Sequence, residues 1–285
     1  MSGKFKNLPD LLSQSVAAFG DNPRFGTRSK GGGWSYMTYR EFGQKVDAFR
    51  AGLASIGVGV GDRVAMISDN SPEWAIAAYA VYGLGACFVP MYEKQNPDDW
   101  RFIIEDSGAK VVLVSGPKIA AKGAAKLVDE LDGLERLIDL SGEGPDSFAG
   151  LCAVGLAAPV PATDPGWDDL CGFIYTSGTT GNPKGVLLSH GNICSNVNAV
   201  QELFPMQNDV SLSFLPWAHS FGQTLELHTL TSFGSASAIV DDVNNLIPYM
   251  SEVHPTVLFS VPRVFNKLYD KLNKSMNEAP PAKKM

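Results

Sequence analysis

The sequence has few cysteines, few histidines and no excess of basic residues, and each shortage excludes a class of protein. Its 285 residues include four cysteines, none in a CxxC pair, and four histidines. This spacing argues against a zinc site and fits a reducing compartment such as the cytoplasm. Because 23 Lys and Arg stand against 30 Asp and Glu, the net charge is −7 and no basic field exists to bind a nucleic-acid backbone.

A long hydrophobic run is also missing. The longest, from Ala75 to Val89, is shorter than the roughly 20 residues that a membrane-spanning helix needs. The first residues, MSGKFKNLPDLLSQSV, lack the apolar centre of a signal peptide. We therefore expect a cytoplasmic protein without a transmembrane segment, and leave peripheral contact with the inner face of a membrane open.

What the sequence does contain is a regular alternation of extended and helical patterns. Apolar residues make up 45% of the chain, which is enough for a large core. The alternation predicts an α/β fold of mostly parallel sheets flanked by helices. The expected strands are residues 63–68, 86–92, 109–116, 134–142, 170–178, 210–216, 235–240 and 256–261. The expected helices are residues 39–56, 96–107, 117–131, 192–203, 220–233, 243–253 and 263–276, together with one that begins at Pro72 after the candidate cap Ser71; Gly108 follows the helix 96–107.

Residues 141–169 interrupt this alternation. They are rich in Gly, Pro and Ala and show no clear periodicity, which is typical of a connector. We expect it to separate two α/β subregions, 1–140 and 170–285.

The stretch YTSGTTGNPKG, from Tyr175 to Gly185, follows an apolar strand and gathers hydroxyls, glycines and one lysine. In open α/β sheets, ligands bind at the carboxyl ends of strands. Glycines at 178, 181 and 185 allow the backbone N–H groups to approach a ligand, while the hydroxyls and Lys184 add donors and a cation. The stretch therefore predicts an oligophosphate site, and the alternative is a polar surface loop.

Two better-known nucleotide motifs do not fit. When GxxxxGK[ST] is aligned on Gly178, Pro183 replaces the second glycine and Gly185 the hydroxyl residue, so a Walker-type loop is disfavoured. The run GVGVGDR from Gly57 has Asp62 where a dinucleotide fingerprint needs its third glycine, and it follows a helix rather than a strand.

As a whole, YTSGTTGNPKGVLLSH resembles the phosphate-loop signature of the AMP-forming adenylating enzymes. LSFLPWAHSFGQ, from Leu212 to Gln223, and PTVLFSVPRVFNKLYDKL, from Pro255 to Leu272, resemble segments of the long-chain fatty acyl-CoA synthetases in that superfamily. The resemblance covers nearly the whole chain. It implies a ligase that uses ATP and Mg²⁺ to convert a carboxylic acid, of medium or long chain, into an acyl-adenylate, and then transfers the acyl group to coenzyme A.

Site residues follow from the resemblance position by position. The phosphate-binding role falls on Thr176, Ser177, Gly178, Thr179, Thr180, Gly181 and Lys184, and Thr176 matches a hydroxyl that ligates magnesium in some relatives. His219 matches the histidine beside the reacting carboxylate; its alternative is a buried histidine bonded to a backbone carbonyl. No acid stands between Leu212 and Leu225, which argues against an amino-acid substrate, whose ammonium group would need one.

Family members continue well beyond the position that matches Met285. We therefore expect this chain to be the N-terminal, AMP-binding part of a synthetase whose partner is the missing C-terminal half, and to be inactive alone. Two other functions stay open: a non-catalytic module that binds a nucleotide or another chain, and a ligase for aryl or short-chain acids.

Overall fold

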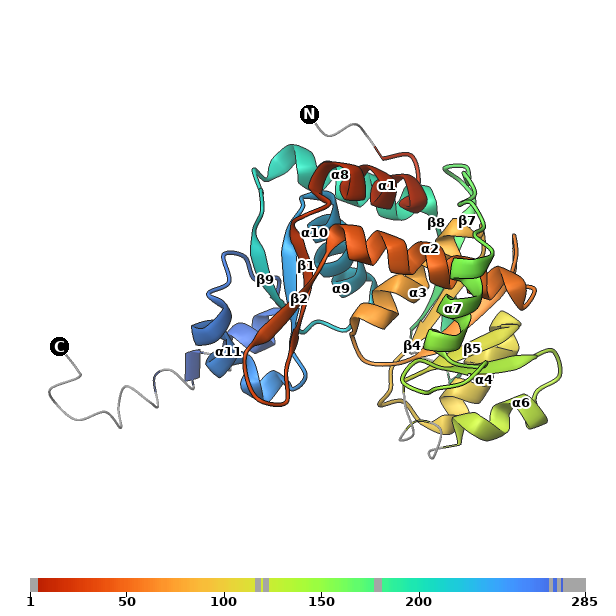
Figure 1. The fold of residues 1–285 in the computed structure, drawn as a ribbon. Helices are drawn as coiled ribbons and strands as arrows, with labels where there is room; N and C mark the ends of the chain where they lie inside the picture. The colour runs from red at the N-terminus through yellow and green to blue at the C-terminus, as the bar shows by residue number, and fades with distance from the viewer. Residues whose placement is uncertain are drawn as a thin grey trace, which may run out of the picture.

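Two β-sheets and the helices around them make up the part of the chain that the computed structural model describes, residues 5–115, 119, 123–176, 181–266, 269, 270 and 273 (Figure 1). The strands are Pro23–Arg28 (β1), Trp34–Thr38 (β2), Arg63–Ile67 (β3), Cys87–Met91 (β4), Val111–Val114 (β5), Arg136–Asp139 (β6), Leu170–Thr176 (β7), Lys184–Ser189 (β8), Val210–Ser213 (β9) and Ala236–Ile239 (β10). The α-helices are Leu8–Phe19 (α1), Tyr39–Ser55 (α2), Pro72–Gly83 (α3), Pro97–Ser107 (α4), Leu127–Glu130 (α6), Phe148–Ala157 (α7), His190–Leu203 (α8), Ser220–Gly222 (α9), Leu230–Ser232 (α10) and Leu246–Val253 (α11). Short 3₁₀ turns cover Ala124–Lys126 (η1) and Val243–Asn245 (η3), and Gln223–Thr229 (η2) is a π-helix.

The larger sheet has the order β6-β5-β3-β4-β7-β8, parallel except for the β7–β8 pair. The smaller sheet has the order β2-β1-β10-β9, parallel except for β1–β2. Mostly parallel sheets with helices packed on them confirm the predicted fold class.

Helices on both faces of the larger sheet explain why its strands are apolar throughout. In β3, Val64 and Met66 point into one core cluster, whereas Ala65 and Ile67 point into another that contains Trp100 of α4. Alternate residues of a strand face opposite sides of the sheet, so a strand that is covered twice needs apolar residues at every position. A third cluster, on the outer face of the smaller sheet, packs β9 and β10 against α11.

Helix α3 lies between the two sheets, with α2 beside it (Figure 1). Ser71 caps the helix by accepting the Trp74 N–H, and Pro72 occupies the first turn, as the sequence predicts. Because α3 has neighbours on every side, no polar stripe is present and all its residues except Glu73 are buried.

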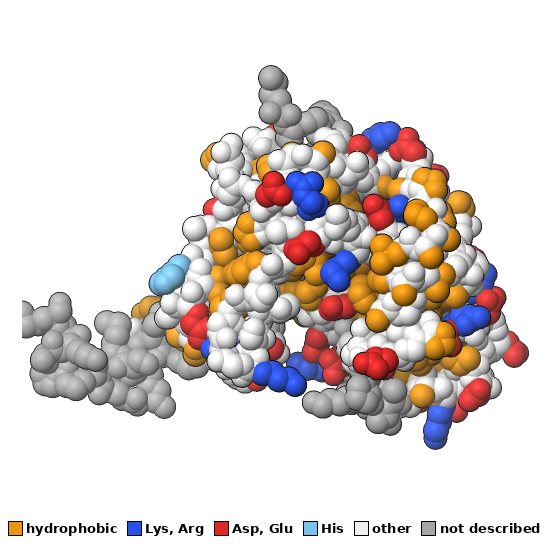
Figure 2. Space-filling model, in the orientation of Figure 1, with side chains coloured by type: hydrophobic (Ala, Val, Ile, Leu, Met, Phe, Trp, Pro, Cys, Tyr) orange, Lys and Arg blue, Asp and Glu red, His pale blue; other side chains and the backbone are white. Residues whose placement is uncertain are grey.

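Residues 141–169, expected to form an irregular connector, contain helix α7, which packs along α2. Backbone contact makes this packing close: a Cβ added at Gly52 would collide with the Leu151 carbonyl, and one added at Gly155 with the Ala48 carbonyl. Helical periodicity is hidden because the outward face is also apolar, with Val154 and Leu156 exposed (Figure 2). Each of the two sheets contains strands from both of the expected subregions, 1–140 and 170–285.

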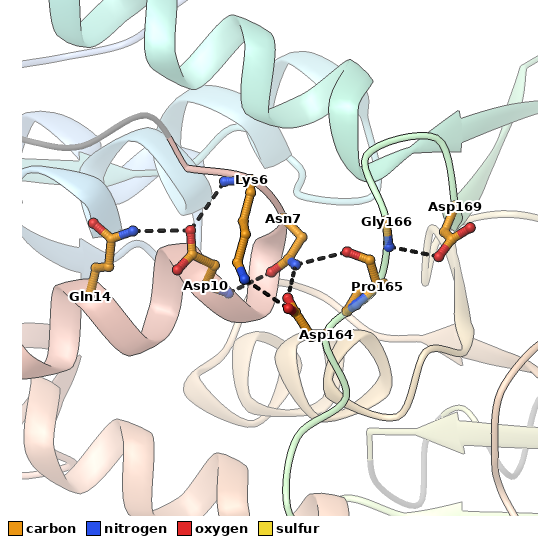
Figure 3. A network of polar contacts seen from close by, with 8 residues as sticks. All are labelled: Lys6, Asn7, Asp10, Gln14, Asp164, Pro165, Gly166 and Asp169. Carbon is orange, nitrogen blue, oxygen red and sulfur yellow. Dashed lines mark hydrogen bonds and ion pairs between the residues drawn. The ribbon is translucent and has the colours of Figure 1, made fainter.

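The end of this segment is held by the N-terminus of α1 (Figure 3). The Asn7 amide donates to Asp164 Oδ1 and to the Pro165 carbonyl, both at 2.8 Å, while its oxygen caps α1 by accepting the Asp10 N–H. Lys6 forms an ion pair with Asp164 at 2.8 Å, although both side chains are exposed, so the amide bonds carry most of the connection.

Several local predictions need correction. The hairpin β1–β2 and strand β8 were not predicted, and the expected strand 256–261 makes only one bridge, Ser211 to Val257. The expected helix 220–233 is divided by the π-helix η2. Half of the expected helix 263–276, and part of the expected helix 117–131, lies outside the described residues. Among those described, no helix combines the length and the apolar character needed to cross a bilayer.

The contact between α2 and α7 gives a direct test. Replacing Gly155 with Ala places a methyl group against the α2 backbone, and overpacking of this kind costs about 1–3 kcal/mol, more than the helix propensity gained. We expect urea denaturation to show a lower free energy of unfolding for Gly155→Ala. Gly59→Ala is the control, because no atom lies within 4 Å of the added Cβ. Equal stability of both variants would contradict the proposed packing.

Candidate functional site

The predicted phosphate loop connects two adjacent antiparallel strands. Thr176, the last residue of β7, pairs with Lys184, the first of β8, and Tyr175 pairs with Gly185. A Walker loop leads from a strand into a helix, so this hairpin agrees with the exclusion of that motif. Residues 177–180, Ser177, Gly178, Thr179 and Thr180, lie outside the described part of the chain, and their phosphate contacts stay predictions.

The two residues at the base of the loop present their side chains to solvent. Thr176 and Lys184 are both exposed, and Lys184 forms no hydrogen bond or ion pair with any residue that the structure describes. Gly181 has φ +125°, a conformation that a side chain would strain. Gly185, expected with Gly178 and Gly181 to bring backbone N–H groups close to a ligand, lies within strand β8, where it pairs with Tyr175.

Tyr175 fixes the base of this hairpin. A Cβ at residue 185 would lie 3.0 Å from the Tyr175 ring, so glycine is needed for the ring to lie across β8. The Tyr175 hydroxyl donates to Asp106 Oδ2 at 2.6 Å, which ties the hairpin to α4. Burial, and then the bond to Asp106, raises the pKa of Tyr175, so the phenol keeps its proton at neutral pH.

His219 ends the turn that follows β9. Its side chain is exposed, and its Nδ1 accepts the Phe221 N–H at 3.2 Å, which caps α9. This bond selects the tautomer with the proton on Nε2, an atom without a partner among the described residues. The alternative of a buried histidine bonded to a carbonyl therefore does not apply, and Nε2–H can donate to a ligand.

Asn70, which the sequence did not single out, brings the His219 turn to the larger sheet. Its amide nitrogen donates to the Leu215 carbonyl at 2.8 Å, and its oxygen accepts the Trp217 N–H at 2.9 Å. Asn70 follows the carboxyl end of β3, and β7 ends at the same edge because β3, β4 and β7 are parallel. The turn that carries His219 therefore joins the sheet edge from which the Lys184 hairpin extends.

Glu226 was also missed, because it lies one residue beyond the segment noted for lacking acids. Its side chain is fully buried on η2, and burial raises its pKa to about 8. Ser213 Oγ donates to Oε2 at 2.5 Å, and the N–H groups of Phe214 and Leu215 lie 3.4 Å from Oε1; these bonds oppose the rise. A sequence offers little signal for such a residue, since an isolated acid in a helix is normally on the surface.

Three further aromatic or imidazole side chains, Trp217, His190 and His228, have structural roles. Trp217 is fully buried, and its ring lies edge-on to that of Trp74, with 5.6 Å between the ring centroids. His190 and His228 are fully buried, and burial lowers their pKa values to about 4 and about 3. His228 Nδ1 pairs with the Tyr79 hydroxyl at 2.9 Å, and His190 Nδ1 accepts the Leu8 N–H at 3.3 Å.

The AMP-binding enzyme family model matches residues 12–284, and the chain belongs to this family. Among its relatives is the long-chain-fatty-acid–CoA ligase FadD15 of Mycobacterium bovis, 33% identical over 255 residues, an alignment that covers 84% of this chain and 41% of that protein. The peroxisomal long chain acyl-CoA synthetase 7 of Arabidopsis thaliana is 28% identical, covering 97% of this chain and 42% of the relative. The chain thus spans about two fifths of the length of these curated relatives.

Solved structures agree with the fold. The inhibitor-bound N-terminal domain of FACL13 from Mycobacterium tuberculosis matches with a TM-score of 0.78 at 25% identity, covering 92% of this chain and 64% of that one. The A domain of a carboxylic acid reductase from Segniliparus rugosus, in complex with AMP and a co-purified carboxylic acid, has a TM-score of 0.85 at 21% identity, covering 99% and 53% of the two chains. The second likeness shows the fold alone.

The buried histidines predict a loss of stability in acid. Below pH 6.5 the unfolded chain protonates its histidines, while folded His228 stays neutral until about pH 3, so acidification favours unfolding. Between pH 6.5 and 4.5, His228→Phe should reduce the slope of unfolding free energy against pH by about 1.4 kcal/mol per unit.

Glu226 acts in the opposite direction, because its raised pKa makes its contribution present below about pH 4.5 and lost as the pH rises toward 8. Glu226 is unchanged in His228→Phe and in the control variant, so its pH-dependent contribution cancels when the slopes of the two variants are compared. His254→Asn is the control, since His254 is exposed and Asn tolerates its positive φ of 51°. A His228→Phe slope equal to that of the unsubstituted chain would exclude a neutral buried His228.

Proposed function

We propose that this chain supplies the triphosphate-binding part and the carboxylate-facing part of an ATP-dependent ligase that joins a fatty acid to coenzyme A. The observation that carries the proposal is the junction at Asn70, which places the His219 turn at the sheet edge that bears Thr176 and Lys184. Membership of the AMP-binding enzyme family, and relatives that are long-chain-fatty-acid–CoA ligases, support this choice of reaction.

The reaction has two steps. A carboxylate oxygen attacks the α-phosphorus of ATP, which forms the acyl-adenylate and releases pyrophosphate. The thiol of coenzyme A then attacks the acyl carbon, forms the thioester and releases AMP. Because both reactants of the first step are anions, the protein contributes mainly cations, aligned donors and positioning.

In this proposal the hairpin holds the β- and γ-phosphates. Lys184 contributes the positive charge, and the loop from Ser177 to Gly181 contributes backbone N–H groups and hydroxyls. Thr176 offers an exposed oxygen beside Lys184, which suits Mg²⁺ when phosphate oxygens supply most of its ligands. Bound Mg²⁺ would neutralise part of the phosphate charge.

His219 faces the carboxylate in this scheme. Its Nε2–H can donate one hydrogen bond to a carboxylate oxygen, while Nδ1 stays engaged with the Phe221 N–H. Glu226 is buried and bonded to β9, so it is not available to hold an ammonium group. The site therefore favours an acid without an α-amine.

We also propose that the 285 residues do not complete the ligation alone, because relatives are more than twice as long. Pyrophosphate release measured with ATP, Mg²⁺ and a panel of long-chain, short-chain and aryl acids tests this. We expect no turnover by this chain, and restored turnover, greatest with long-chain acids, when the remaining part of a relative is co-expressed. Turnover by the chain alone would contradict the proposal, and preference for an aryl or short-chain acid would reassign the substrate.

Replacement of Lys184 tests the phosphate role. Loss of a charge-assisted contact is worth about 1.5–3 kcal/mol, so Lys184→Ala should weaken ATP binding by roughly 10- to 150-fold in isothermal titration calorimetry. Lys30→Ala, which removes an exposed lysine from another loop, is the control and should bind ATP as the unsubstituted chain does. Unchanged affinity in Lys184→Ala would remove Lys184 from the site.

A further inference from the structure

Glu226 is a buried carboxyl group without a cationic partner. It forms no ion pair with a described residue, and its hydrogen bonds come from three consecutive residues at the end of β9, Ser213 to Leu215. The buried Arg24 guanidinium binds the backbone carbonyls of Glu226 and Leu227, at 3.4 and 2.9 Å, rather than the carboxylate. The carboxyl group therefore binds one short segment of the chain, through one side-chain hydroxyl and two backbone N–H groups.

Burial of such a group is expensive, and a well-packed apolar side chain often stabilises a protein as well or better. The helix that carries it is also unusual, because η2 has the wide hydrogen-bond pattern of a π-helix, which is frequently found at functional sites. Burial of the carboxyl group therefore imposes a cost on the fold, and η2 is the element that carries this group against β9.

The contacts of Glu226 close a loop in the chain. The backbone leaves β9 at Ser213, turns through residues 214–218, reaches His219 and returns through α9 and η2 to Glu226, which binds Ser213 again. Trp217 Nε1 donates to Ser213 Oγ at 3.1 Å, so one chain of hydrogen bonds runs from Trp217 through Ser213 to Glu226.

The return path is tightly packed. The Gln223 N–H donates to the His219 carbonyl at 2.9 Å, and a Cβ added at Gly222 would lie 2.5 Å from the Pro216 carbonyl. The turn thus has little freedom once its two ends are joined, and Asn70 holds its middle from the other sheet.

We propose that Glu226 is a positioning residue that joins the two ends of this loop and so fixes the direction in which the His219 imidazole presents Nε2–H. The importance of that direction for ligation rests on the role proposed for His219 above. Glu226 itself touches neither nucleotide nor acid in this scheme.

Histidine NMR on the ¹⁵N-labelled 285-residue chain tests the proposal without any need for turnover. Unsubstituted His219 should show the Nε2–H tautomer, because Nδ1 accepts the Phe221 N–H. At pH 9, above the raised pKa of Glu226, both carboxylate oxygens accept hydrogen bonds, whereas Glu226→Gln keeps the shape but replaces one of these oxygens with an NH₂ group that faces a donor. We expect the His219 nitrogen shifts to move toward those of a ring that exchanges between tautomers, and the Trp217 indole N–H signal to shift with them.

The matched control is Thr229→Val, three residues away on the same helix, where the buried hydroxyl has no partner among the described groups. It changes a buried polar residue of η2 without touching the loop closure, so the His219 signals should stay in place. A folded Glu226→Gln chain with unchanged His219 shifts would overturn the proposal, as would an equal shift in Thr229→Val. If Glu226→Gln does not fold, Ser213→Ala decides by the same signals, because it removes the hydroxyl that joins Trp217 to Glu226 and leaves the two backbone N–H contacts of the carboxyl group in place.

Titration of each chain with ATP and Mg²⁺ separates this proposal from the proposed function. The hairpin, not the His219 turn, binds the triphosphate, so Glu226→Gln should bind ATP within about twofold of the unsubstituted chain. A loss of ATP binding as large as that of Lys184→Ala would show that Glu226 supports the whole site and overturn its specific role. Failure of the unsubstituted chain to bind ATP would reject the proposed function, while the His219 shifts would still decide whether Glu226 positions the ring.

Discussion

Burial of α3 between two sheets is the constraint on which the rest of the structure depends. A helix without a polar face has to be covered on all sides, and here the two sheets, α2 and other helices cover it. The core cluster around it includes Phe25 from the smaller sheet and Phe88 from the larger one. Because interiors are close-packed, this shared core sets the separation of the sheets.

Because the shared core fixes the separation of the sheets, a single side-chain amide can join a loop at the end of the larger sheet to a loop at the end of the smaller one. Asn70 follows a strand of the larger sheet and binds both sides of the turn that follows β9 of the smaller sheet. A side chain of this length reaches only because the helix layer brings the two edges close. The proposed site therefore depends on a core with no polar role of its own, in agreement with the general observation that functional loops are positioned by a rigid scaffold.

The sequence predicted those features that local chemistry determines. The apolar strands β3 and β4, the Ser71 cap before α3 and Gly108 after α4 all follow from residues that are neighbours in the chain. Strand β8 was missed because a short apolar run can be a strand or part of a helix, and only its pairing with β7 decides. Helix α7 was missed because its packing uses glycines and leaves an apolar outer face, so no amphipathic pattern remains.

Some residues of the candidate site were predicted from the sequence and others were missed. Hydroxyls, glycines and Lys184 mark the hairpin in one stretch of sequence, and His219 required a family resemblance to be noticed. No local sequence pattern singles out Asn70 or Glu226. The role of each side chain depends on a hydrogen-bond partner more than ten residues away in the chain. Long-range hydrogen bonds of this kind become visible only when the fold is known.

The hairpin between β7 and β8 has an electrostatic consequence. A loop that leads into a helix offers an anion the partial positive charge of the helix N-terminus, which is part of the scaffold. Here a strand follows the loop, so the fixed charge near the proposed phosphates is the exposed ammonium group of Lys184. Attraction from an exposed charge is screened by ions, with a Debye length of about 8 Å at physiological ionic strength. Nucleotide affinity at this hairpin should therefore decline with added salt more steeply than at a helix-backed loop.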